Sequence, residues 1–183
     1  SWGVPNLPDN AAERHWVQAL YHLTKTLDTS RLVVGNDGWE SVSTDVIGIH
    51  DYEGVAEGIA QRYRSHESRP KLFRHARPGG RILVLGGEAH LEHPIVLSEF
   101  GGMTLSSDPK GWGYRRCRDS KELAWEYRRL LETVRSLDLI SGFCYTQFAD
   151  TYQEANGLLY ADRTPKFPLE EIARATRGNA LPR

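Results

Sequence analysis

Short apolar segments alternate with amphipathic ones along the chain. Four runs of mostly apolar residues, 31–35, 45–50, 95–98 and 140–148, have the length of buried β-strands. In the segments before and after these runs, apolar residues recur every three or four positions, which is the spacing of an α-helix. Strands that alternate with helices are typical of a parallel sheet covered by helices. The pattern therefore predicts an α/β fold.

Four helices are predicted. The first runs from about Asn10 to Asp28, where Asp9 or Asn10 can cap the start and Glu13 stands in the position of a capping-box acid. The apolar stripe of this helix consists of Trp16, Leu20, Leu23 and Leu27. The other helices cover residues 55–65, 119–137 and 169–176.

The remaining segments are predicted to be loops or short strands. Residues 67–80 are basic and end in prolines and glycines, which predicts a long loop, and residues 81–85 are apolar and strand-like. The segment from Met103 to Asp119 predicts a loop of about 17 residues that contains Trp112 and Tyr114. Loops of this length without secondary structure are uncommon and are often functional.

Polar or aromatic residues follow each predicted strand at the point where it ends. In parallel α/β folds the carboxyl ends of the strands face the active site. We therefore expect these residues to converge on one pocket. They are Trp39, then His50, Asp51 and Tyr52, then Glu99, and finally Gln147 with Asp150.

Composition narrows the class of protein. The 183 residues, a length that suggests one domain, carry 23 Lys and Arg against 24 Asp and Glu, a balance that argues against nucleic-acid or anionic-membrane partners. No apolar run approaches the roughly 20 residues of a membrane span, and the first residues lack the pattern of a signal peptide. Two cysteines are too few for a disulfide framework, which favours a reducing compartment such as the cytoplasm.

Glu99 is the carboxylate best placed for catalysis. A charged group at the end of a buried strand is held rigidly by its neighbours, and the two glycines after Phe100 let a ligand approach closely. The alternative is an ordinary charged residue at the solvent boundary. The Tyr52 hydroxyl can donate a hydrogen bond to a carboxylate and keep it ionised. Trp39 and Trp112 can stack on sugars, although core packing is the commoner role of tryptophan.

Two other chemistries have weaker support. His90 and His93 have a spacing that metal ligands use, with Glu88 and Glu92 beside them, but the segment is a predicted loop without a zinc-protease signature. We therefore predict no metal and no cofactor. Arginines on both sides of Cys117 can lower the pKa of its thiol, yet nothing marks the histidine that a cysteine hydrolase needs.

Several segments, taken together and in order, resemble the catalytic domain of family 2 glycoside hydrolases, which include β-galactosidases, β-glucuronidases and β-mannosidases. Residues 94–102, PIVLSEFGG, resemble the nucleophile strand of that family. Residues 142–150, GFCYTQFAD, with 154–159 and 162–166, resemble its last barrel strand and the following loop. The other similar segments are IHDY at 49–52, NDGWE at 36–40 and SWGVP at 1–5.

The resemblance implies a TIM (β/α)₈ barrel of which residues 1–183 form the second half, with strands five to eight. It implies a retaining exo-glycosidase for a β-linked sugar, which works by double displacement with two carboxylates about 5–5.5 Å apart. By resemblance Glu99 is the nucleophile and Tyr52 hydrogen-bonds to it. The implied substrate contacts are Trp39, His50, Trp112, Gln147 and Asp150.

The resemblance also predicts that half of the catalytic machinery lies outside this sequence. In the family, the acid/base glutamate directly precedes a segment like Ser1-Trp2-Gly3, so we expect a chain that is poorly active or inactive unless it is paired with the other half. The expected partners are a carbohydrate substrate and either the other half of the barrel or a second copy, bound through exposed sheet edges. The alternative function is a non-catalytic carbohydrate-binding or interaction module, with Trp39, Trp112 and Tyr52 as sugar platforms.

Overall fold

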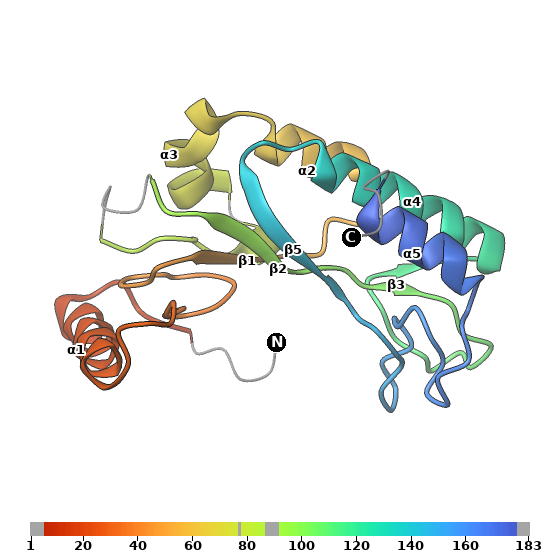
Figure 1. The fold of residues 1–183 in the computed structure, drawn as a ribbon, viewed down its shortest axis with the longest axis horizontal. Helices are drawn as coiled ribbons and strands as arrows, with labels where there is room; N and C mark the ends of the chain where they lie inside the picture. The colour runs from red at the N-terminus through yellow and green to blue at the C-terminus, as the bar shows by residue number, and fades with distance from the viewer. Residues whose placement is uncertain (1–5, 77, 87–91, 179–183) are drawn as a thin grey trace. The chain divides into compact units, whose positions relative to one another are not determined.

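The computed structural model describes residues 6–76, 78–86 and 92–178 (Figure 1). The chain divides into two compact units, and each is described by itself. Unit 1 comprises residues 1–51, 62–99 and 139–144, and unit 2 comprises residues 52–61, 100–138 and 145–183. Within the described ranges, no helix has both the length and the apolar character needed to pass through a lipid bilayer.

Three of the four predicted strands pair in one sheet of the described structure. They are β1 (Ile47–Asp51), β2 (Ile95–Gly101) and β5 (Ile140–Thr146), in the order β1-β2-β5. Ile47 and Leu97 are completely buried, as expected where a strand is covered on both faces. The prediction of an α/β fold with parallel strands is confirmed.

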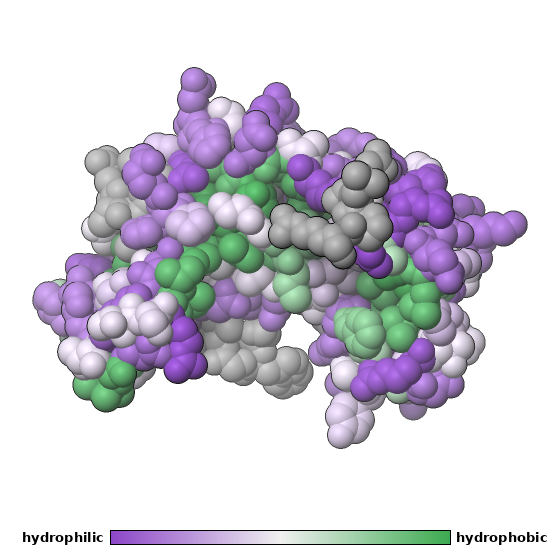
Figure 2. Space-filling model, in the orientation of Figure 1, coloured by the Kyte–Doolittle hydropathy of each residue, from purple (hydrophilic) through white to green (hydrophobic). Residues whose placement is uncertain are grey.

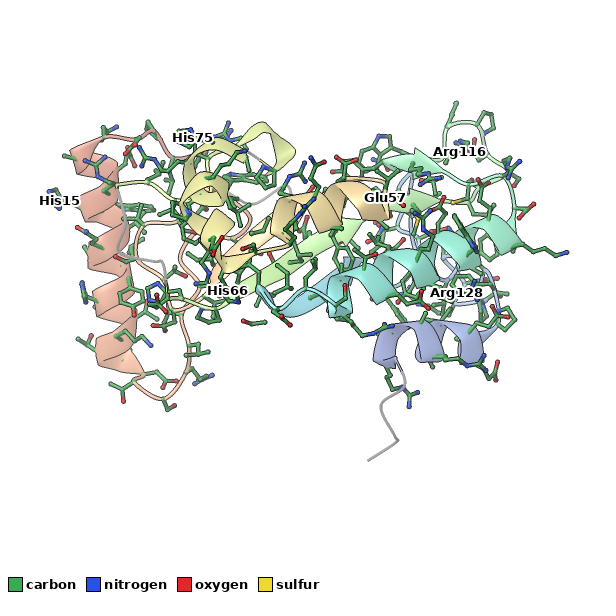
Figure 3. The ribbon with its side chains drawn as sticks, turned by 90° about the horizontal axis from the view of Figure 1, so that it is seen from above. His15, Glu57, His66, His75, Arg116 and Arg128 are labelled. Atoms are coloured by element: carbon green, nitrogen blue, oxygen red, sulfur yellow. The ribbon has the colours of Figure 1, made fainter. Side chains whose placement is uncertain are left out.

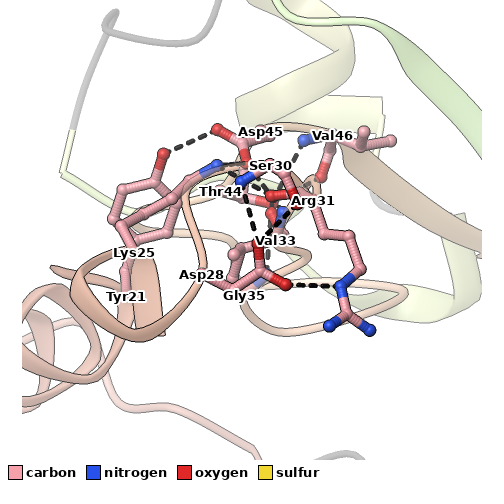
Figure 4. Close-up of polar contacts among 10 residues, drawn as sticks. All are labelled: Tyr21, Lys25, Asp28, Ser30, Arg31, Val33, Gly35, Thr44, Asp45 and Val46. Carbon is pink, nitrogen blue, oxygen red and sulfur yellow. Dashed lines mark hydrogen bonds and ion pairs between the residues drawn. The ribbon is translucent and has the colours of Figure 1, made fainter. Parts of the chain in front are cut away.

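The prediction of a strand at residues 31–35, the first along the chain, is wrong. Its backbone groups bind the side chains of a later turn instead of a neighbouring strand (Figure 4). Val33 N donates to Asp45 Oδ2 at 2.7 Å, and Gly35 N donates to Thr44 Oγ1 at 3.1 Å. The Val33 carbonyl accepts a hydrogen bond from Asp45 N at 2.8 Å. Because these backbone groups are already satisfied, the segment has little to gain from pairing in a sheet.

The first helix is confirmed as α1 (Ala11–Leu27), but its apolar stripe does not lie in a core of the described structure. Asn10 caps the helix, since its side chain accepts a hydrogen bond from Glu13 N at 3.0 Å. Val17 is buried, and a pocket of about 230 Å³ lies between α1 and residues 33–36. Figure 2 shows hydrophobic surface in the region of α1. The exposed residues of the stripe are Trp16, Leu20, Leu23 and Leu27.

Short helical turns replace the long loop predicted for residues 67–80. Leu72 and Phe73 are buried, and the Phe73 carbonyl accepts hydrogen bonds from Leu83 N at 3.1 Å and Val84 N at 3.3 Å. These contacts anchor the basic segment to unit 1, which explains why it coils instead of remaining an open loop. The turns are η1 (His66–Ser68), α3 (Arg69–Lys71), η2 (Leu72–Ala76) and η3 (Pro78–Gly80).

Two further predictions concern the segments on either side of these turns. The second helix is confirmed as α2 (Ala56–Tyr63). The strand-like residues 81–85 are not a strand, and they form only an isolated parallel bridge between Val84 and Ser41.

Unit 2 contains the helix with the clearest sequence pattern, which is confirmed as α4 (Ser120–Arg135). Asp119 caps it by accepting a hydrogen bond from Glu122 N at 2.8 Å. The last predicted helix is confirmed as α5 (Leu169–Arg177), and it packs on α4, where the Tyr127 hydroxyl lies 2.8 Å from Thr176 Oγ1. The buried residues of the predicted α4 stripe are Leu123, Tyr127, Leu130, Val134 and Leu137.

The predicted loop from Met103 to Asp119 has some structure of its own. The two-residue strands β3 (Met103–Thr104) and β4 (Arg115–Arg116) pair in parallel within it. The Thr104 carbonyl also accepts a hydrogen bond from Cys117 N at 2.8 Å. This pairing fixes both ends of the segment that carries Trp112 and Tyr114.

Candidate active site

In unit 1 the ends of two neighbouring strands bring His50 and Glu99 together. His50 is the fourth residue of β1, and Glu99 follows Ser98 on β2. The His50 side chain is 2% exposed, and its Nδ1 atom lies 3.3 Å from Glu99 Oε2 without meeting hydrogen-bond geometry. The Glu99 side chain keeps about a quarter of its surface exposed. A ligand can therefore reach the Glu99 carboxylate, which lies against a buried imidazole.

Asp37 and Ser98 extend this pair into a polar chain. His50 Nε2 lies 3.2 Å from Asp37 Oδ2, and the Ser98 hydroxyl donates to Asp37 Oδ1 at 2.6 Å. Burial raises the pKa of Asp37, but the hydrogen bonds from His50 and Ser98 outweigh that effect, so the pKa lies below its ordinary value. Asp37 therefore remains a carboxylate that orients the His50 ring.

Two glycines leave the space that Asp37 and His50 occupy. A Cβ atom at Gly48 would lie 1.8 Å from Asp37 Oδ1. A Cβ atom at Gly38, whose φ is +86°, would lie 2.5 Å from the His50 ring. The sequence reasoning did not select Asp37 or Ser98 as site residues, and these glycines are the signal that points to Asp37, because glycine within a strand marks a close approach.

Trp39 completes the group of predicted residues in unit 1. Its ring lies 5.2 Å from the His50 ring in an edge-on arrangement, and the Arg81 guanidinium lies 6.0 Å from the Trp39 ring centroid. Arg81 also forms an ion pair with the buried Glu40, which accepts a hydrogen bond from Leu7 N at 2.5 Å. Of the seven predicted site residues, unit 1 thus brings Trp39, His50 and Glu99 together.

Asp51 follows His50 in β1 but has a different environment. It is buried and binds two residues of α2, forming an ion pair with Arg62 and accepting a hydrogen bond from Tyr63 Oη at 2.6 Å. Burial and then the Asp51 carboxylate raise the pKa of Tyr63 well above its ordinary value. These contacts show Asp51 anchoring a helix to the strand.

The other four predicted residues lie in unit 2. Tyr52 and Trp112 both contact the ring of Tyr114, with ring centroids 3.7 Å and 4.8 Å away. Gln147 Nε2 donates to Asn156 Oδ1 at 2.7 Å and lies 3.4 Å from Glu154 Oε2. The convergence of all seven predicted residues on one pocket remains a prediction.

Asp150 has structural contacts on the same loop. Its Oδ1 atom accepts hydrogen bonds from Lys166 Nζ at 2.7 Å and Gly157 N at 2.8 Å. Lys166 also donates to the Ala155 carbonyl at 2.8 Å. Burial lowers the pKa of Lys166, and the Asp150 carboxylate opposes that shift.

The sequence also offered a cysteine and a histidine-rich segment as weaker candidates for chemistry. Cys117 does not have the lowered pKa that neighbouring arginines could give it, because the residue is buried and burial raises the pKa of its thiol to about 11. The histidine-rich candidate for metal binding begins at Glu88, and residues 87–91 lie outside the described residues. Elsewhere in the described chain, no three His, Cys, Asp or Glu side chains are grouped to hold a metal ion.

Comparison with known proteins supports the fold and not more than the fold. No protein-family model matches the sequence. No curated protein matches it either. Solved structures do match, and among them are two structures of a family 2 β-galacturonidase and several β-glucuronidases, so the predicted resemblance is confirmed at the level of structure.

Three of these solved structures illustrate the match. The family 2 β-galacturonidase of Eisenbergiella tayi, bound to galacturonate, has a TM-score of 0.60 and 16% identity over 94% of this chain and 32% of that chain. The β-D-glucuronidase of Dictyoglomus thermophilum has a TM-score of 0.58 and 18% identity over 94% of this chain and 30% of that chain. The β-glucuronidase of Ruminococcus gnavus, in complex with D-glucuronic acid, has a TM-score of 0.58 and 16% identity over 95% of this chain and 31% of that chain. The present chain spans about a third of the length of these structures.

Proposed function

We propose that this chain is part of the catalytic barrel of a retaining β-glycoside hydrolase and that Glu99 is the nucleophile. The observation that carries the proposal is the Glu99 carboxylate in the second half of β2, which lies 3.3 Å from the buried His50 ring. His50 in turn contacts Asp37, and Asp37 accepts a hydrogen bond from Ser98. A partly exposed carboxylate in a fixed orientation is what nucleophilic attack on a sugar requires. The fold comparison supports the reaction class.

The proposed reaction has two displacements. In the first, a Glu99 oxygen attacks the anomeric carbon, the bond to the leaving-group oxygen breaks with its electron pair, and an acid/base carboxylate protonates that oxygen. In the second, water replaces Glu99 and the ester bond to the sugar breaks. The resemblance implies a second, acid/base glutamate for this step, and it gives Tyr52 the role of a hydrogen-bond donor that tunes the nucleophile.

His50 has a specific part in this proposal. A neutral imidazole has one N–H group and donates to one carboxylate, whereas an imidazolium donates to both. His50 lies between the carboxylates of Asp37 and Glu99, at 3.2 Å and 3.3 Å. We propose that it orients Glu99 from below the surface and that the partly exposed ring of Trp39 lines the sugar subsite.

The nucleophile is tested by trapping. A glycosyl fluoride with fluorine also at C2 forms the covalent intermediate without needing a proton on its leaving group, so it reports on Glu99 independently of the acid/base residue. The reagent is made in the gluco, galacto, manno and glucurono configurations, and the products are analysed by mass spectrometry. We expect one glycosyl group on the peptide that contains Glu99. Glu99→Gln should remain unlabelled, and Glu132→Gln, which changes an exposed carboxylate of α4, is the control and should label as the parent chain does. Labelling at another residue would contradict the assignment.

We also propose that α1 packs against further β/α units of the barrel. A complete (β/α)₈ barrel takes about 250 residues, and each of its helices covers strands with an apolar face. The α1 stripe is exposed in the described structure, and the matched solved chains are about three times as long as this one. Mixing this chain with a separately made chain of the other four units should give a one-to-one complex in sedimentation experiments. A self-associated dimer in place of that complex contradicts the proposal.

A further inference from the structure

In unit 2 a second tyrosine, Tyr114, lies flat against Tyr52. The two rings are parallel, with centroids 3.7 Å apart and an angle of 11° between their planes. This separation is van der Waals contact, so neither ring can rotate far unless the other moves with it. Tyr114 therefore limits the directions in which the Tyr52 hydroxyl can point.

Gly102 leaves the space in which the two rings lie together. Its φ is +63°, and a Cβ atom at this position would lie 2.5 Å from the Tyr114 ring and 3.0 Å from the Tyr52 ring. Tyr114 N also donates a hydrogen bond to the Gly102 carbonyl at 2.9 Å. The stack is therefore packed against a glycine backbone, and any larger residue there would push the rings away.

The backbone that carries Tyr114 is held on both sides. Before it, Trp112 N donates to the Gln153 carbonyl at 2.7 Å. After it, β4 pairs in parallel with β3. Arg116, labelled in Figure 3, donates to two backbone carbonyls of the same loop. Because its backbone is fixed at both ends, Tyr114 gives the Tyr52 ring a neighbour with a defined position.

The residue after Tyr114 fixes the chain just after Tyr52. Arg115 Nη1 donates to the Gly54 carbonyl at 2.8 Å, and a Cβ atom at Gly54 would lie 3.4 Å from Arg115 Cδ. Arg115 also forms an ion pair with Glu126 of α4, which is buried. Two consecutive residues of one loop thus hold another loop, Tyr114 through the Tyr52 ring and Arg115 through the backbone of Gly54.

We propose that Tyr114 is a positioning residue, which holds the Tyr52 ring so that its hydroxyl can donate a hydrogen bond to the nucleophile Glu99. Such a bond weakens steeply when its distance or angle departs from the optimum, so the direction of the hydroxyl matters. The role of Tyr52 in this inference rests on the proposed function, whereas the stacking of the two rings does not. Tyr114 acts through Tyr52 and needs no contact with the substrate.

The kinetic test compares the rates at which the C2-fluorinated glycosyl fluoride labels Glu99. Tyr114→Ala removes the stacking ring and should slow labelling about tenfold, the effect of weakening one hydrogen bond to a charged group. Tyr114→Phe keeps the ring and should label as the parent chain does. Tyr52→Phe removes the hydroxyl and should slow labelling at least as much as Tyr114→Ala. In the double variant Tyr114→Ala should add no further loss, and additive losses would overturn the proposal.

The pH dependence of labelling separates positioning from a general loss of structure. A hydrogen bond donated to a carboxylate favours its charged form, so the acidic limb of the rate profile should move to higher pH in Tyr114→Ala and in Tyr52→Phe. Trp125→Ala is the matched control, because Trp125 is 44% exposed, Tyr114 is 49% exposed, and both lie in unit 2. It should leave the profile unchanged. An unshifted profile in Tyr114→Ala, or an equal shift in Trp125→Ala, would contradict the inference.

A measurement on Tyr52 itself needs no reaction at Glu99. In NMR spectra of the chain with isotopically enriched tyrosine, the Tyr52 ring signals are identified by their loss in Tyr52→Phe. The stacked Tyr114 ring shields the Tyr52 ring protons, so these signals should move downfield in Tyr114→Ala and stay in place in Tyr114→Phe. Unmoved signals in Tyr114→Ala would refute the positioning role. Moved signals in a chain that is not labelled at Glu99 would refute the proposed nucleophile and leave Tyr114 as the residue that holds Tyr52.

Discussion

The buried pair of Asp150 and Lys166 allows the loop after β5 to be tested by a double-mutant cycle. The Lys166 side chain is completely buried and that of Asp150 is 11% exposed, and their charged atoms lie 2.7 Å apart. The Lys166 ammonium group has one other hydrogen bond, to the Ala155 carbonyl, and it lies 5.3 Å from the Tyr160 ring centroid. Removing the carboxylate leaves a buried cation with only these partners.

The expected magnitude follows from this geometry. Breaking a buried ion pair by removing one partner costs roughly 3–5 kcal/mol. We expect the lower end for Asp150→Asn, because the asparagine oxygen can still accept from Gly157 N. At roughly 2–4 °C per kcal/mol for a chain of this size, about 3 kcal/mol lowers the melting temperature by about 6–12 °C. Lys166→Met should cost less, because the Asp150 carboxylate keeps its bond to Gly157 N.

The decisive measurement is the double variant Asp150→Asn with Lys166→Met. Calorimetric melting should show it no less stable than Asp150→Asn alone, which corresponds to a coupling of about 2 kcal/mol. Additive losses would refute the reasoning, because they would mean that the two groups act independently. A melting temperature that stays unchanged in Asp150→Asn, with weaker sugar binding, would instead support the sequence-based role of Asp150 as a substrate contact.

Three further predictions use other parts of the chain. At pH 8 an iodoacetamide reagent should modify the exposed Cys144 and spare Cys117, whose buried thiol has a pKa raised to about 11; modification of both in the folded chain would contradict this. Leu23→Glu should leave the melting temperature nearly unchanged because Leu23 is 57% exposed, whereas Val17→Glu should unfold unit 1 because Val17 is 7% exposed. Hydrogen bonds from Lys25 and Tyr21 lower the pKa of Asp45 from 3.8 to about 2, so ionised Asp45 stabilises the fold above pH 3.8. That contribution should be lost as the pH falls to about 2, and Asp45→Asn should flatten this part of the curve of stability against pH.

Sequence periodicity predicted a helix and its buried face correctly where the residues at helical spacing are also the ones that the core buries. The α4 stripe recurs at helical spacing, and its leucines are also the residues that unit 2 buries, so pattern and structure coincide. The same pattern in α1 located the helix but not its surroundings, since Leu20 and Leu23 are exposed. Periodicity shows that a helix has an apolar face, and it does not show what covers that face.

Polar side chains explain where the pattern failed. Residues 31–35 have the apolar composition of a strand, but Asp45 and Thr44 satisfy their backbone groups from ten or so positions away. Leu72 and Phe73 similarly turn a basic loop into helical turns because they are buried. Such contacts depend on where the chain returns, which local composition does not encode.

The candidate site shows the same division. Glu99 and His50 were selected from their places near strand ends, and Trp39 lies beside His50 although no strand precedes it. The role of Asp37, by contrast, depends on a space that Gly48 leaves open. Gly48→Ala tests that dependence. A methyl group there would lie 1.8 Å from Asp37 Oδ1, so Asp37 must move away from His50 and the Glu99 carboxylate loses its orientation. Since a displacement of about 1 Å can cost about 100-fold in rate, labelling of Glu99 by the C2-fluorinated reagent should slow by up to that factor while the melting temperature changes little. Ser98→Ala keeps the space and removes one hydrogen bond to Asp37, so it should slow labelling less. If Gly48→Ala labels as fast as the parent chain, Asp37 and His50 do not position the nucleophile, and Glu99 would have to owe its orientation to other contacts.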